Sequence, residues 1–78
     1  NEQYVAATTP LKGALDLARG DDKGRIYMSL AEAFFYGGDY RQALTYVNEA
    51  AKFDNQRRSA RSWKGYIQST AKRKGVDL

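Results

Sequence analysis

Residues 24–57 decide the fold; they read GRIYMSLAEAFFYGGDYRQALTYVNEAAKFDNQR. In the first half, apolar residues recur at helical spacing and form one face: Tyr27, Leu30, Ala31 and Phe34. The Gly37-Gly38 pair ends this helix, because glycine readily adopts the left-handed conformation of a helix C-terminus. Asp39 is a good N-cap for a second helix, whose expected apolar face is Tyr40, Ala43, Leu44, Val47, Ala50 and Ala51. Two helices joined by so short a turn lie antiparallel.

The sequence on either side predicts two further helices. Thr9 and Pro10 fit an N-cap with proline in the first turn, so we expect a helix over residues 9–20 with its apolar face at Leu11, Ala14, Leu17 and Ala18. Residues 1–8 fit either a preceding helical turn, with Tyr4 and Val5 apolar, or a loose end. The last helix should run from near Gln56 to about Arg73 and end at Gly75, with an apolar face of Ala60, Trp63, Tyr66, Ile67, Thr70 and Ala71.

The pattern of residues 24–57 resembles one tetratricopeptide repeat (TPR), a motif of 34 residues. The first helix of that motif carries an aromatic, a leucine, a small residue and a large aromatic, which match Tyr27, Leu30, Ala31 and Phe34. Gly38, Asp39 and Tyr40 match its turn, and Ala43, Leu44 and Ala50 match its second helix. Two positions depart from the motif: Ala31 replaces the usual glycine, and Asp54-Asn55 lacks the usual proline. Neither departure disturbs the packing that the motif needs.

The resemblance implies an all-α fold: a right-handed, TPR-like stack of three to four antiparallel helices, in a single domain over residues 1–78. A shift of one repeat length aligns Leu11 with Leu44 and Asp21 with Asp54. The helix at 9–20 is therefore expected to be the second helix of a truncated preceding repeat, and residues 58–74 a basic capping helix. Because such arrays need at least three repeats, we expect the chain to belong to a longer array or to self-associate.

The composition removes several classes of site. The chain has neither cysteine nor histidine, which excludes disulfides, thiolate metal sites and Ser-His-Asp catalysis. It also lacks a phosphate-cradling glycine loop, so we expect no enzyme activity, no catalytic or metal-binding residues and no cofactor. Its longest apolar runs are only a few residues, and neither a signal peptide nor a membrane span is indicated. The sequence predicts a soluble domain and leaves its compartment open.

The TPR resemblance implies a groove that binds a partner peptide or helix, lined mainly by first helices. The matching positions are Arg25, Met28, Ser29, Glu32, Phe35 and Tyr36. We expect Met28, Phe35 and Tyr36 to be exposed apolar surface, which usually marks an interaction site; the alternative is that the N-terminal helix covers them. Some members of the family clamp a C-terminal carboxylate, but Arg25 with Ser29 supplies only half of such a clamp, so this specificity is not expected.

The last helix is strongly basic and offers an alternative function. Residues 57–74 contain seven basic residues and no acidic one, whereas residues 1–56 carry a net charge of −2. Nucleic acid or another anionic surface could bind at Arg57, Arg58, Arg61 and Lys64, with Trp63 and Tyr66 as stacking groups. The opposing interpretation is a solvated cap whose Trp63 packs inward against Leu44, Val47 or Ala51. A third hypothesis is a homo-oligomer that pairs through residues 11–17.

Overall fold

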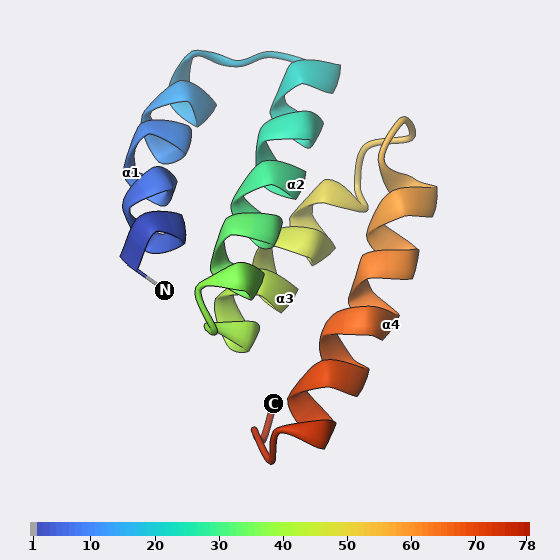
Figure 1. Cartoon of the computed structure of the whole chain (residues 1–78). Helices are drawn as coiled ribbons and strands as arrows, with labels where there is room; N and C mark the ends of the chain where they lie inside the picture. The colour runs from blue at the N-terminus through green and yellow to red at the C-terminus, as the bar shows by residue number, and fades with distance from the viewer. Residues whose placement is uncertain (1) are drawn as a thin grey trace.

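The computed structural model describes the backbone of residues 2–78 and the side chains of Ala6 and residues 8–78. This part of the chain forms four α-helices: α1 (Glu2–Leu17), α2 (Asp21–Tyr36), α3 (Tyr40–Ala50) and α4 (Arg57–Arg73). Each helix packs on the next and runs roughly antiparallel to it (Figure 1). α2 lies between α1 and α3, and α4 packs on α3. The predicted all-α class is therefore confirmed.

The turn between α2 and α3 forms as the sequence predicts. Gly38 has a φ of 89°, and its N–H donates to the carbonyl of Phe35 at 3.1 Å. The N–H of Asp39 donates to the carbonyl of Phe34 at 2.9 Å. The Asp39 carboxylate then accepts a hydrogen bond from the backbone N–H of Gln42 at 3.2 Å, which caps α3. One short segment thus closes one helix and opens the next.

The first helix is longer than predicted. α1 begins at Glu2 and passes through Pro10, so the assignment of Thr9-Pro10 to a helix start was wrong. Residues 2–8 are helical, which decides between the two interpretations of the N-terminus, although the side chains of Tyr4 and Val5 lie outside the described residues. Proline inside a helix removes one backbone hydrogen bond. Here α1 continues past it and packs along α2.

The buried face of α1 also differs from the predicted one. Thr8 is buried, and Leu11 and Leu15 pack against the core, whereas Ala14 and Leu17 are exposed. The residues in contact are spaced by three and four, so they form a helix face rotated from the one predicted. The physical reason is tertiary: the packing of α1 on α2 decides which side of α1 is covered, and residue spacing along α1 alone does not fix that side.

α2 begins at Asp21, three residues before the repeat-like segment 24–57. Gly20 has a φ of 58°, a value that glycine adopts without strain, and it turns the chain into the helix. Asp21 and Asp22 lie in the first turn, where negative charge is favourable at the positive end of the helix dipole. The turn at Gly20 and the two acidic residues account for this early start of α2.

α4 has the predicted bounds. It ends at Arg73, and Gly75 with a φ of 75° reverses the chain. The N–H of Val76 then donates to the carbonyl of Ala71 at 2.8 Å, which satisfies one of the carbonyls left free at a helix end. Within residues 2–78, no helix combines the length and apolar character needed to cross a bilayer.

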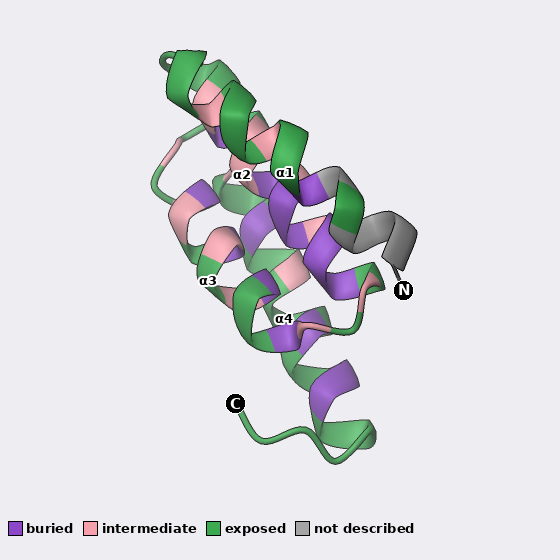
Figure 2. Ribbon diagram, turned by 90° about the vertical axis from the view of Figure 1, so that its left-hand side faces the viewer, coloured by how far each residue is buried: buried purple, intermediate pink, exposed green. Residues whose placement is uncertain are grey.

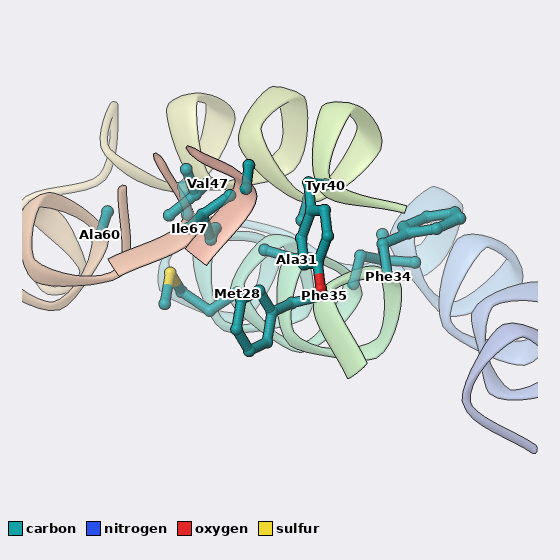
Figure 3. Close-up of a cluster of buried hydrophobic side chains, with 12 residues drawn as sticks. Met28, Ala31, Phe34, Phe35, Tyr40, Val47, Ala60 and Ile67 are labelled. Carbon is teal, nitrogen blue, oxygen red and sulfur yellow. The ribbon is translucent and has the colours of Figure 1, made fainter. Parts of the chain in front are cut away.

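The core lies where α2, α3 and α4 meet. Leu30, Val47 and Ile67, one from each helix, are fully buried. Figure 2 shows the buried positions facing inward along these helices and the exposed ones facing out. Phe34 and Phe35 point to different sides of α2 (Figure 3). Phe34 stacks on Tyr46 of α3 at 5.5 Å between ring centroids, and the Lys12 ammonium of α1 lies 5.3 Å from its ring.

Candidate binding surfaces

Two of the six predicted groove residues are core residues. Met28 and Phe35 were expected to be exposed, but they retain only 6% and 8% of their accessible surface. For Phe35, the cover is also not the N-terminal helix that the alternative interpretation named. Phe35 is covered by α4, whose Trp63 and Tyr66 rings lie 5.4 and 5.2 Å from the Phe35 ring. Phe35, which was predicted to be exposed in an open groove, is therefore covered by the chain itself.

An aromatic cluster forms over Phe35 and remains partly open to solvent. It comprises Tyr36 of α2 with Trp63 and Tyr66 of α4, and we call these three residues the aromatic face. Trp63 lies edge-on to Tyr36 at 6.2 Å and to Tyr66 at 5.8 Å. Tyr36 and Tyr66 remain 51% and 52% exposed. Edge-to-face contacts of this kind fix ring orientation, so the exposed tyrosines rest on a packed base.

The polar groove residues extend this surface along α2. Arg25, Ser29, Glu32 and Tyr36 follow one another at helical spacing and share one side of α2. The Arg25 guanidinium lies 3.7 Å from the Asp22 carboxylate. Burial raises the pKa of the Glu32 carboxyl above its usual value, because removal from water disfavours the charged form. None of the described side chains brings a cation within 4 Å of Glu32.

The basic residues of α4 are divided between its sides. Arg57, Arg61 and Lys64 line a hollow of about 270 Å³ between α3 and α4, which we call the basic hollow. Arg58 does not line it. Arg57 is also paired with Asp54 at 2.8 Å. Three of the four predicted anion-binding residues are thus brought together.

The structure separates these cations from the aromatic rings. Trp63 and Tyr66 contact Phe35 of α2, whereas Arg61 and Lys64 lie beside Val47 and Asn48 of α3. The predicted interleaving of basic and stacking groups on one surface is therefore wrong, because successive residues of a helix are rotated by about 100°. The opposing interpretation was that Trp63 packs inward on a solvated cap, and Trp63 is indeed partly buried against the core. The rings that Trp63 contacts belong to Phe35, Tyr36 and Tyr66.

A third surface lies between α1 and the start of α2. Leu17 is 84% exposed and lines a shallow, mainly apolar hollow, together with Ala14, Ala18, Asp22, Arg25 and Ile26. This exposed apolar end belongs to the segment that the sequence suggested for self-association. Among the side chains that the structure describes, no three acidic ones come close enough to form a metal site.

The chain matches no protein-family model, no curated protein and no solved structure. A function for the chain must therefore be argued from its own residues. Sequence reasoning missed that Trp63 and Tyr66 belong to the same surface as Tyr36. Their spacing of three residues in the sequence could have shown that both rings lie on one side of α4.

Proposed function

We propose that the chain is a protein-interaction module whose aromatic face, with the polar side of α2, binds a peptide or helix of another protein. In this proposal α2 and α3 form one TPR-like repeat. α1 is the second helix of a preceding partial repeat, and α4 is the cap. The order of helix contacts, α1 with α2, α2 with α3 and α3 with α4, supports such a stack. The proposed surface keeps Arg25, Ser29, Glu32 and Tyr36 of the predicted groove.

The observation that carries the proposal is the half-exposure of Tyr36 and Tyr66 on a packed aromatic base. Tyrosine and tryptophan are enriched among the residues that dominate binding energy at protein interfaces. Rings already held by neighbours lose little conformational freedom on binding, which favours affinity. Ser29 and Glu32 add polar groups along the same side of α2, where they would set the orientation of the bound segment.

The second candidate is binding of nucleic acid or an anionic surface through α4. Its support is the run of seven basic residues at 57–74. It would have to act through phosphate contacts alone, since Trp63 and Tyr66 lie with Phe35 and away from the basic hollow. Such binding weakens steeply with salt, which distinguishes it from binding at the aromatic face.

The test must avoid Met28 and Phe35, because substitutions at buried core positions would damage the fold. We would instead compare the wild type with a Tyr36→Ser, Tyr66→Ser variant. A matched control is Arg58→Ser, Lys72→Ser, which also changes two exposed side chains to serine. Far-UV circular dichroism should be the same for all three proteins. Nuclease-treated lysate from the native cell is then passed over each, and retained proteins are identified by mass spectrometry.

We expect at least one protein to be retained by the wild type and the control and lost by the tyrosine variant. With that protein purified, the two substitutions should weaken binding about thirtyfold, the effect of removing one interface hot spot of about 2 kcal/mol. The proposal fails if the Tyr36→Ser, Tyr66→Ser variant retains the same proteins as the wild type. If instead only the Arg58→Ser, Lys72→Ser control loses the retained proteins, and nucleic acid is recovered with the wild type when nuclease is omitted, the second candidate is favoured.

A further inference from the structure

The basic hollow has an apolar floor as well as a charged rim. Its floor is Ala51, the partly exposed C-cap residue of α3, above the closely packed side chains of Val47 and Ala60. Val47 and Ala60 are buried beneath it, and Figure 3 shows Val47 of α3 next to Ile67 of α4. Its rim carries Asn48, Arg57, Arg61 and Lys64. The hollow therefore offers both an apolar contact and positive charge.

The positive charge of the rim is only partly neutralised within the chain. Arg57 is paired with Asp54. No other described carboxylate lies within 4 Å of Arg61 or Lys64. Asn48 adds an amide that can donate hydrogen bonds to the same space. The hollow is thus complementary to a ligand that brings negative charge together with a small apolar group.

We propose that the basic hollow binds an acidic peptide segment of a partner protein, with an apolar side chain on the floor and neighbouring carboxylates against Arg61 and Lys64. A nucleic acid fits this site less well. Its bases would need aromatic rings beside the cations, but Trp63 and Tyr66 lie against Phe35 of α2. A sugar-phosphate backbone also has no group that matches an apolar floor.

This inference goes beyond the proposed function and does not depend on it. The basic hollow lies between α3 and α4, whereas the aromatic face is formed by α2 and α4. Each surface therefore has its own reporters: Asn48, Ala51 and Lys64 for the hollow, and Tyr36 and Tyr66 for the aromatic face. Failure at one surface leaves the other intact and can be recognised separately.

The experiment is a titration of the ¹⁵N-labelled chain, followed by two-dimensional NMR. The first probe is the peptide acetyl-Glu-Leu-Glu-Leu-Glu-amide, and the second has serine in place of both leucines and the same charge. The third probe is a single-stranded oligothymidylate of similar length. We expect the leucine peptide to give saturable shifts at Asn48, Ala51, Ala60 and Lys64, and to bind about fivefold more tightly than the serine peptide, because it buries apolar surface.

Two charge-reversal variants provide the matched comparison. Arg61→Glu changes the rim of the hollow, and Arg58→Glu makes the same change on the same helix outside it. For the leucine peptide, Arg61→Glu should weaken binding about fivefold or more, and Arg58→Glu less than about twofold at physiological salt. Circular dichroism confirms that both variants fold.

Three outcomes would overturn the proposal. The first is the absence of saturable shifts around the hollow at peptide concentrations up to about 1 mM, the weakest binding of interest. The second is equal binding of the leucine and serine peptides, or equal losses in the two charge-reversal variants, because the site would then recognise charge alone. The third is tighter binding of the oligothymidylate with both variants weakened, which would assign α4 to nucleic acid.

Discussion

Gly24 of α2 is buried against Phe53 and Gln56, in the segment between α3 and α4. A Cβ atom built on Gly24 would lie 2.9 Å from both Cβ and Cγ of Phe53 and 3.2 Å from Cγ of Gln56. The Cβ and Cγ of Phe53 sit close to its backbone, so rotation of the ring cannot relieve the contact. The Phe53 ring also lies 6.1 Å from that of Tyr27. Replacing Gly24 with alanine should therefore push α2 and this segment apart.

Two opposing terms set the size of the effect. Alanine favours a helix over glycine by about 1 kcal/mol. Extra volume in a packed site costs roughly 1–3 kcal/mol, so a cost of about 2 kcal/mol leaves Gly24→Ala destabilised by about 1 kcal/mol. Gly65 in α4 is the matched control, because an added Cβ would meet no atom within 4 Å. At Gly65→Ala only the helix preference of alanine acts, so the free energy of unfolding should rise by about 1 kcal/mol.

Thermal unfolding followed by far-UV circular dichroism measures both changes. For a domain of this size, 1 kcal/mol corresponds to a Tm shift of about 4–8 °C. We therefore expect Tm to fall by about this amount for Gly24→Ala and to rise by about this amount for Gly65→Ala. In a Phe53→Gly background both opposing atoms of Phe53, Cβ and Cγ, are removed, so Gly24→Ala should destabilise much less than in the wild type. Equal stabilisation by the two glycine substitutions in the wild-type background would refute the close packing of α2 on Phe53.

Three further predictions concern a helix cap, a carboxyl group and an exposed leucine. Asp39→Ala should lower the free energy of unfolding by about 1 kcal/mol, measured by urea titration, because it removes the cap of α3; an unchanged midpoint would argue against the cap. Burial raises the pKa of Glu32 in the folded state. Above that pKa, the ionised carboxylate lowers the free energy of unfolding. This loss of stability disappears as the pH falls below the pKa of glutamate in the unfolded chain, about 4.3. Glu32→Gln should therefore be slightly more stable than the wild type near neutral pH, and the gap in Tm should close in acid; a gap independent of pH would contradict this. Leu17→Glu should remain monomeric by light scattering at concentrations where the wild type associates, and a wild type monomeric throughout would exclude pairing through Leu17.

Local chemistry made the region of α2 and α3 predictable. The positive φ of Gly38, the cap at Asp39 and the burial of Leu30, Phe34 and Val47 all follow from residue type and helical spacing. In these elements each local signal favours the same structure, so the sequence alone predicts that structure. The C-terminal stop at Gly75 is another local signal of this kind.

The start of α1 could not be read in the same way. Proline is common in the first turn of a helix and costly inside one, so Pro10 favoured the wrong boundary. The cost of an interior proline is about 3 kcal/mol, and here α1 nevertheless extends on both sides of it. Contacts of α1 with α2, including Leu11 and Leu15 against the core, oppose this cost. Such tertiary contacts are absent from local sequence rules.

The candidate site illustrates the same limit at the level of side chains. Helical spacing placed Phe35 beside the core face of α2, but it could not say that α4 would cover that side. Once Trp63 and Tyr66 lie on Phe35, the exposed part of the surface shifts to Tyr36 and Tyr66. Which surface remains open therefore depends on where α4 docks. That is a property of the whole packing and of no single helix.

The docking of α4 also explains how one helix can contribute to two chemically different surfaces. In sequence, Arg61, Trp63, Lys64 and Tyr66 alternate and read as one mixed patch. On the helix, the buried row Ala60, Ile67 and Ala71 separates them. The rings turn toward α2, and the cations turn toward α3. The two proposed ligands would therefore contact different sides of α4, one against α2 and the other against α3.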